Sequence, residues 1–262
     1  MFAHLKLALS DCYRFREVLV NLLSQNLKVK YKRTFLGYFW SLLNPILQLA
    51  VLSFVFSNIM KIGPENYTLF LFSGMLAWTF LSTSMVAGST ALLENETFIK
   101  KVYLPKILFP LSKVCLQLVD FIFGLVALGI LMAILGFPFK ATIFLVPLAV
   151  IILFFFTLGL SLMLAVANVY FRDVQYLLGV FLQLLYFATP IIYPLNTLPE
   201  QYQPILSLNP LYPPISLFQK LIYYGQIPAE TEWLLSASLA FLSLSAGMGI
   251  LLAFDEDVVF RM

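Results

Sequence analysis

Long apolar stretches bounded by charge, proline or glycine are the sequence feature that most limits how this chain can fold. They lie near 35–60, 67–93, 108–136, 141–167, 174–195 and 232–254. Each reaches the about 20 residues that a helix needs to cross a bilayer. Only 11% of the 262 residues are charged and 61% are hydrophobic, so a soluble fold could not cover this much apolar surface. We therefore predict an all-α membrane protein with six transmembrane helices in a single domain, 1–262.

The positively charged residues indicate which ends of these spans face the cytoplasm. If the loops alternate between two sides, 13 of the 16 Lys and Arg residues share one side, leaving Lys61, Lys140 and Lys220 on the other. The positive-inside rule then places both termini in the cytoplasm, in agreement with an even number of spans. The N-terminus is interrupted by Asp11 and Arg14, so we do not expect a signal peptide.

Composition also excludes several other kinds of protein. Cys12 and Cys115 are the two cysteines and are too few for a disulfide scaffold. With His4 as the single histidine, we expect no metal site. The net charge of +3 is too small to suggest a nucleic-acid partner.

The segment 10–33 is too charged to span the membrane, although its apolar residues recur at helical spacing. We predict an amphipathic helix in the cytoplasmic interface, with a basic end made of Lys28, Lys30, Lys32 and Arg33. This cluster either contacts lipid headgroups or a partner, or serves only as a topology anchor, and charge alone does not separate the two roles.

A second unusual segment, 196–230, precedes the last span on the outer side. It is apolar but broken by several prolines, so its runs are too short to cross the membrane. We expect two short re-entrant or interfacial helices here, packed against the bundle at the outer mouth of a pathway.

Polar residues recur on single faces of two predicted spans. Ser41, Asn44 and Gln48 share a face in the first span, and Lys113, Gln117 and Asp120 share one in the third. Polar side chains in a membrane face the bundle or a water-filled cavity. They either line a channel or join helices, and for Lys113 and Asp120 we favour pairing with neighbouring helices.

Four blocks of sequence resemble the ABC-2 type permeases that export polysaccharides such as O-antigen, capsule and teichoic acid. They are KVKYKRTFLGYFWSLLNP (28–45), FIKKVYLPKILFP (98–110), YFRDVQYLLGVFLQLLYFATPIIYP (170–194) and LNPLYPPISLFQKLIYYG (208–225). Each block alone is a weak signal, but their joint occurrence in family order is specific. One departure is Gln219, followed by Lys220, where the family often has arginine.

The resemblance implies a homodimer of this chain with two copies of a separate ATP-binding cassette ATPase. This assembly would lie in the bacterial inner membrane, among membrane lipids, and export an undecaprenyl-diphosphate-linked glycan. The chain has no G-x-x-x-x-G-K-[ST] phosphate-binding loop, so ATP and Mg would be bound by the partner ATPase. We therefore expect neither a cofactor nor a catalytic residue in this chain.

The loop 94–106, between the second and third spans, resembles the element that couples such permeases to their ATPase. A short helix such as Thr97–Tyr103 would present Phe98 and Val102 on one face, with Lys100 and Lys101 beside them. Pro105 would end this helix. The alternative is a plain positively charged loop with no coupling role.

The resemblance also suggests where the substrate is bound. Arg33 and Lys30 lie at headgroup depth, where they would bind the lipid pyrophosphate. The candidate channel residues are Tyr38, Trp40, Asn44, Gln48, Tyr186 and Tyr193. Aromatic rings pack on the CH faces of sugars and would hold a sliding glycan weakly.

Three other functions remain open from the sequence. An ABC-2 exporter of a drug or small lipid would share the spans and the coupling loop. A glycan-processing enzyme would need paired carboxylates or a histidine cluster, which are not evident. A proton-coupled carrier would need a relay in the membrane, for which Asp120 is the single candidate. The acidic group Asp255, Glu256 and Asp257 is most simply interpreted as a solvated tail.

Overall fold

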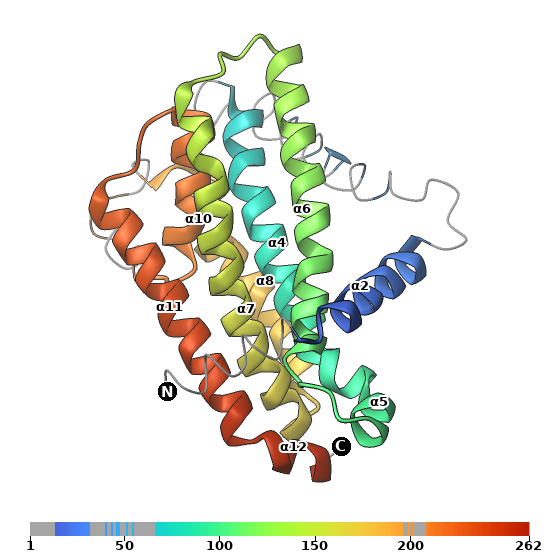
Figure 1. Ribbon diagram of the computed structural model, residues 1–262. Coiled ribbons are helices and arrows are strands. Elements are labelled where there is room, and N and C mark those ends of the chain that lie inside the picture. The colour runs from blue at the N-terminus through green and yellow to red at the C-terminus, as the bar shows by residue number, and fades with distance from the viewer. Residues whose placement is uncertain are drawn as a thin grey trace.

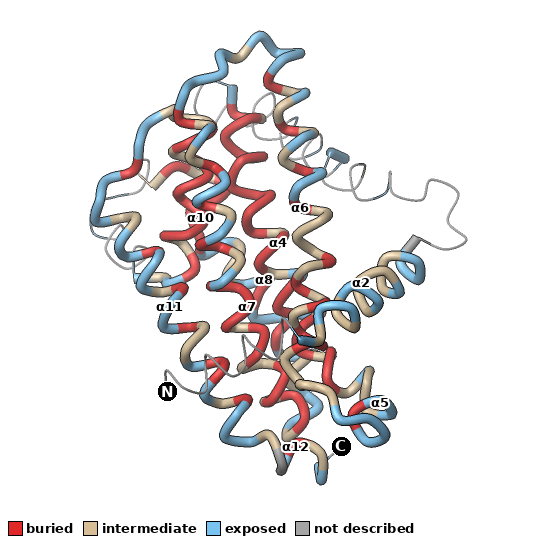
Figure 2. The backbone as a smooth tube through the Cα atoms, in the orientation of Figure 1, coloured by how far each residue is buried: buried red, intermediate tan, exposed pale blue. Residues whose placement is uncertain are grey.

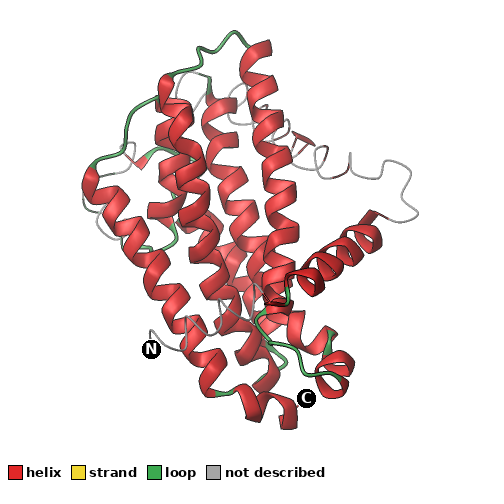
Figure 3. Cartoon of the chain, in the orientation of Figure 1, coloured by secondary structure: helices red, strands yellow, loops and turns green. Residues whose placement is uncertain are grey.

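The structure is a computed structural model that describes residues 14–31, 40, 43, 46, 47, 51, 54, 66–195, 199, 201 and 208–261. Within these residues the chain is helical and contains no strand (Figure 3). The helices are α2 (Arg16–Tyr31), α4 (Tyr67–Glu94), α5 (Glu96–Lys101), α6 (Leu108–Ile134), η2 (Ala141–Leu145), α7 (Val146–Tyr170), α8 (Val174–Ala188), α10 (Tyr212–Phe218), η4 (Gln219–Tyr224), α11 (Glu230–Ala253) and α12 (Asp255–Arg261).

Four long helices, α4, α6, α7 and α11, form a bundle (Figure 1). α4, α7 and α11 run in the same direction and α6 runs in the opposite one; α7 and α11 can be parallel because α8, α10 and η4 lie between them in the chain. The short helices α5 and α12 lie together at one end of the bundle, which we call the base. The loop 135–140 lies at the opposite end.

The central helix of the bundle is α4, which packs on α6, α7 and α8. In its most apolar stretch 78% of the residues are buried, against 28% in α6 and 33% in α11 (Figure 2). A helix that is apolar around its whole circumference is suited to such a central place. The outward faces of α6 and α11 expose apolar side chains, as a helix facing lipid does.

Four of the six predicted spans coincide with helices that are long and apolar enough to cross a membrane: α4, α6, η2 with α7, and α11. The first predicted span, 35–60, lies almost entirely outside the described residues. In the fifth, 174–195, the helix α8 ends at Ala188 after 15 residues, which is about 22 Å and shorter than the hydrocarbon core. The count of six therefore stays a prediction.

Small residues let α7 approach its two neighbours closely. A Cβ atom placed on Gly159 would lie 2.2 Å from the backbone carbon of Ser243 in α11, and one placed on Gly247 would lie 2.4 Å from the oxygen of Gly159. On the other side, Asn168 of α7 donates a hydrogen bond of 3.0 Å to the carbonyl of Ser89 in α4. Glycine contacts and interhelical hydrogen bonds of this kind join helices within membranes.

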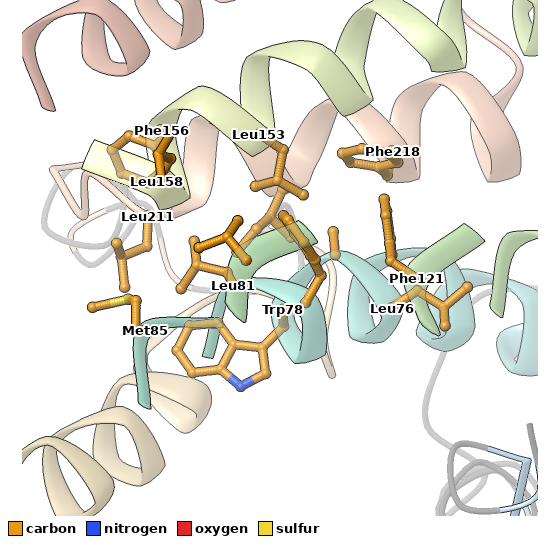
Figure 4. Packing of buried hydrophobic residues seen from close by; sticks show 14 of the residues in the cluster. Leu76, Trp78, Leu81, Met85, Phe121, Leu153, Phe156, Leu158, Leu211 and Phe218 are labelled. Atoms are coloured by element: carbon orange, nitrogen blue, oxygen red, sulfur yellow. The ribbon is translucent and has the colours of Figure 1, made fainter. Parts of the chain in front are cut away.

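Aromatic rings connect the bundle to the segment before the last span. Phe80 of α4 stacks on Phe121 of α6 at 5.2 Å. Phe121 in turn meets the edge of Phe218 at 5.5 Å, and Figure 4 shows these two rings close together. All three rings are buried. The helix α10 is therefore part of the core and packs on α4, α7 and α11. Of the predicted outer segment 196–230, most of 196–207 lies outside the described residues.

Prolines and a glycine explain where the helical segment formed by α10 and η4 begins and ends. Pro213 and Pro214 occupy the first turn of α10, where their missing N–H groups cost no helical hydrogen bond. η4 continues α10 as a π-helix and ends at Gly225, whose φ of 58° favours glycine. In the described part of the predicted segment, α10 and η4 therefore form one continuous helical unit, and the number of two short helices in 196–230 stays a prediction.

Candidate functional site

A large groove lies between α4 and α8 and has a volume of about 1240 Å³. Two residues from the predicted first span, Leu47 and Val51, also line it. The remaining lining residues are Met75, Trp78, Thr79, Ser82, Thr83, Val86, Ala87, Thr90, Glu94, Gly179, Leu182, Gln183, Tyr186 and Phe187. We call this cavity the α4–α8 groove.

One wall of the groove is a stripe of polar side chains along α4. Thr79, Thr83, Thr90 and Glu94 lie within about 60° of one another around the helix at 3.6 residues per turn, over about 22 Å. Thr83 donates a hydrogen bond of 2.6 Å to the carbonyl of Thr79, and Thr90 donates one of 2.6 Å to the carboxylate of Glu94. The hydroxyl oxygens keep lone pairs that can accept hydrogen bonds from a ligand.

Aromatic rings from both helices also line the groove, with Trp78 on α4 and with Tyr186 and Phe187 on α8. The rings of Trp78 and Tyr186 lie 5.7 Å apart, and Phe187 meets the edge of Tyr186 at 5.4 Å. The Tyr186 hydroxyl is buried and has no hydrogen-bond partner among the described residues. A buried polar group without a protein partner in a cavity calls for water or a ligand.

Of the predicted channel residues that the structure describes, only Tyr186 lines this groove. Tyr193 donates a hydrogen bond of 2.9 Å to the carbonyl of Phe187, so it supports the end of α8 from outside the lining. The side chain of Trp40 is exposed. Tyr38, Asn44, Gln48 and Arg33 lie outside the described residues, so their channel and substrate roles stay predictions.

Sequence reasoning missed the hydroxyl stripe. The range 67–93 was treated as an apolar span, and its serines and threonines were given no role. The detectable signal was the repeat of Thr or Ser at intervals of three, four and seven residues over 79–94, because such spacing places them on one face of a helix.

Ion pairs join α2 to α6 at the base side of the bundle. Lys30, predicted to contact substrate, forms a salt bridge with Asp120 in α6. Lys113 pairs with Glu94 at 2.7 Å and lies 3.5 Å from the side-chain oxygen of Asn26 in α2. Both charged residues of α6 thus face partners on neighbouring helices, the arrangement that we favoured from the sequence.

The predicted coupling loop forms the short helix α5 at the base. Phe98 and Val102 are 53% and 51% exposed, whereas Ile99 between them is buried against the bundle. Lys100 pairs with Glu96 at 2.6 Å, and Lys101 is exposed in the last turn. Ile99 therefore anchors α5 to the bundle, whereas Phe98 and Val102 are open to a partner.

The helix α5 ends earlier than the sequence suggested. A helix over Thr97–Tyr103 was expected, but the observed one closes at Lys101 and Val102 is extended, with φ −134° and ψ 132°. Two effects account for this end. Val102 is β-branched and favours extended backbone, and the residue before Pro105 is disfavoured in the helical region.

Metal ligands do not gather in the described part of the chain, where no group of three or more His, Cys, Asp or Glu side chains is found. Several of the described carboxylates instead pair with lysines. One example is Glu232, at the start of α11, which forms a salt bridge with Lys220 of η4.

Four helices that are long and apolar enough to cross a bilayer, packed through small residues, define an integral membrane protein. Residues 17–223 match the ABC-2 type transporter family, and the chain belongs to that family.

Three relatives illustrate the relationship. The chain is 32% identical to the O-antigen export system permease protein RfbA of Myxococcus xanthus, over 92% of this chain and 93% of the relative. It is 30% identical to an RfbA protein of Klebsiella pneumoniae, over 82% and 83%. It is 24% identical to the polysialic acid transport protein KpsM of Escherichia coli, over 90% and 92%.

Proposed function

We propose that this chain is the membrane-spanning permease subunit of an ATP-driven exporter that moves a lipid-linked polysaccharide across the bacterial inner membrane. The observation that carries the proposal is the α4–α8 groove, which is lined by both a hydroxyl stripe and aromatic rings. Membership of the ABC-2 family and the names of the relatives support it. An O-antigen-like glycan is favoured over a capsular one because identity is 32% to the former kind of relative and 24% to the latter.

The chemistry of the groove suits a sugar polymer. Carbohydrate CH faces pack on aromatic rings such as Trp78 and Tyr186, while sugar hydroxyls exchange hydrogen bonds with Thr83 and Thr90. Neutral hydrogen bonds of this kind are each worth about 1 kcal/mol net. Many weak contacts along about 22 Å of helix would hold a glycan without trapping it.

A second copy of the chain would complete the pathway. The helix α8 touches the bundle mainly through Leu178 and Leu182 and exposes Tyr176, Val180 and Leu184 on its other side. In the proposed homodimer these exposed side chains meet the second copy, and the two grooves face one central channel. Such a place fits a helix too short to cross the bilayer unaided.

The energy for transport would come from two copies of a separate ATPase that binds ATP and Mg. The lysines and arginines of the base, which include Lys100, Lys101 and Lys106, support a cytoplasmic location for this end by the positive-inside rule. The exposed side chains of Phe98 and Val102 would insert into a groove of the ATPase, and its closure on ATP would then push on the bundle through α5.

The basic end of α2 would bind the diphosphate of the lipid carrier. Lys30 is already held by Asp120, so Arg33 would make the main phosphate contact in this proposal, with Lys30 adding positive charge beside it. The same pair gives Asp120 a counter-ion, which favours a structural role over a proton relay.

Deletion of the chain in its native host tests the proposed function directly. We expect polymer to accumulate on the cytoplasmic side, attached to its lipid, while surface polymer is lost and is restored by the intact gene. Mass spectrometry of the trapped material identifies the polymer and its lipid. Surface polymer at the normal level would refute the proposal, and accumulation of a small lipid in place of polymer would favour the alternative ABC-2 function.

A further inference from the structure

The C-terminal residues form a helix that is folded back onto the base, and not the solvated tail that their acidic sequence suggested. α12 follows α11 after a single residue, Phe254, and packs on α7 and α5 (Figure 1). Val258 in its middle is completely buried, whereas Phe260 is 88% exposed. A seven-residue helix is unstable alone, so its tertiary contacts must hold it in place.

The first of these contacts joins α12 to the loop that follows α5. The ammonium group of Lys106 lies 2.6 Å from the carboxylate of Asp255 and donates a hydrogen bond of 2.6 Å to its backbone carbonyl. The Lys106 side chain is only 9% exposed, so water screens this pair less than a surface pair. Asp255 is the first residue of α12, so both contacts hold the start of that helix against the loop after α5.

The second contact joins α12 to the end of α7. The ring of Tyr170, the last residue of α7, meets the edge of Phe254 at 5.5 Å. The guanidinium of Arg261 lies 4.5 Å from the centre of the same ring, within the range of a cation–π interaction. Tyr170 therefore contacts residues at both ends of α12.

We propose that α12 is a clamp that holds α5 in a fixed orientation on the bundle, and that Lys106, Asp255 and Val258 are its positioning residues. This inference rests on the proposed coupling role of α5. A force applied to Phe98 and Val102 reaches α7 and α11 only if α5 does not tilt independently. Ile99 is the one buried residue among the six of α5, so contacts from another element are needed to fix the orientation of α5.

The clamp is tested in the full complex with the ATPase by measuring polymer exported per ATP hydrolysed. Lys106→Met keeps the size of the side chain but removes both contacts to Asp255, and Val258→Asp places a charge in a buried position. We expect either change to lower the ratio at least about fivefold, the lower end of typical coupling between distant sites. The control is Phe260→Asp on the exposed face of α12, which should leave the ratio unchanged.

Charge reversal separates a specific contact from general damage. Lys106→Asp and Asp255→Lys should each lower the ratio or the yield of complex, and the double variant should recover a part of both. A double variant no better than either single one would overturn the clamp, as would normal ratios for Lys106→Met and Val258→Asp.

A Phe98→Asp variant in the same assay distinguishes the clamp from the function on which it rests. If Phe98→Asp leaves the ratio unchanged, the coupling role of α5 is wrong. If Phe98→Asp lowers the ratio while the clamp variants do not, the clamp alone is wrong.

Discussion

The helices α7 and α8 follow one another in the chain but are packed in opposite ways. α7 is wedged between α4 and α11, with a glycine in backbone contact and interhelical hydrogen bonds such as that from Asn168. α8 buries only Leu178 and Leu182, and a Cβ atom added at Gly179 meets nothing within 4 Å. We therefore call α7 with its neighbours α4 and α11 the frame, and α8 the wall. The frame is rigid and the wall can move, because close-packed contacts resist displacement and sparse ones do not.

The largest expected effect comes from replacing a glycine by alanine, once in α7 and once in α8. Gly159→Ala forces a methyl group into the backbone of α11, so we expect the free energy of unfolding to fall by about 3 kcal/mol. Gly179→Ala enters open space and should be neutral or stabilise α8 by up to about 1 kcal/mol through helix propensity. Thermal unfolding of the purified protein in detergent measures both. Equal Tm values for the two variants would contradict the contrast between frame and wall.

The next largest effect concerns the coupling of the ATPase to the bundle through α5. Phe98→Asp with Val102→Asp removes the exposed apolar surface of α5, so we expect ATP hydrolysis to continue while export falls at least about tenfold, as for interface hot spots. Export of polymer and release of phosphate are measured on the same complex. Phe98→Leu, which keeps an apolar side chain, is the matched control and should retain coupling. A complex of the double variant that assembles and exports normally would refute the coupling role.

A smaller effect is expected within the groove itself. Thr83→Val and Thr90→Val preserve shape but remove a hydroxyl each, so the export rate should fall about fivefold per hydrogen bond lost, with normal assembly. Ser238→Ala, on an exposed part of α11, removes a hydroxyl outside the groove and should have no effect. Export that is as fast in both threonine variants as in the Ser238 variant would exclude the hydroxyl stripe from the pathway.

The smallest effect tests whether Lys30 acts as an anchor or as a substrate contact. Its salt bridge with Asp120 is partly exposed, so Lys30→Gln should lower stability by about 1 kcal/mol. A double variant, Lys30→Gln with Asp120→Asn, restores neutrality and should recover that stability in a double-mutant cycle. If the double variant is stable but still exports poorly, Lys30 contacts the substrate. If export recovers with stability, Lys30 is only an anchor.

Much of the fold follows from local properties of the sequence. The positions of α4, α6, α7 and α11 follow from runs of apolar residues, and the predicted 67–93 and the observed Tyr67–Glu94 differ by one residue at one end. Helical spacing in the loop 94–106 also predicted that Phe98 and Val102 share one face of a short helix, and both are exposed although Val102 lies just beyond the end of α5. These features depend on residues near one another in the chain, so a pattern within one segment suffices.

The site was harder to predict because its parts come from different segments. Tyr186 was expected to contact substrate, but its neighbour Trp78 and the threonines of α4 became candidates only when α8 was placed beside α4. The acidic C-terminus was misinterpreted for the same reason. Nothing in DEDVVFR indicates that Val258 is buried or that Asp255 meets a lysine 149 residues away.

The sequence by itself determined that this protein is an integral membrane protein, which residues form its long helices, and which family it belongs to. Hydrophobicity and charge act on each segment separately, so they are readable without a fold. Only the tertiary structure decided that Asp120 meets Lys30, that the hydroxyl stripe of α4 lines a groove against α8, and that α12 lies against α5. Such contacts depend on how packed helices are rotated and how far apart they lie. Close approach at residues such as Gly159 sets this geometry, and the sequence of a single segment does not reveal it.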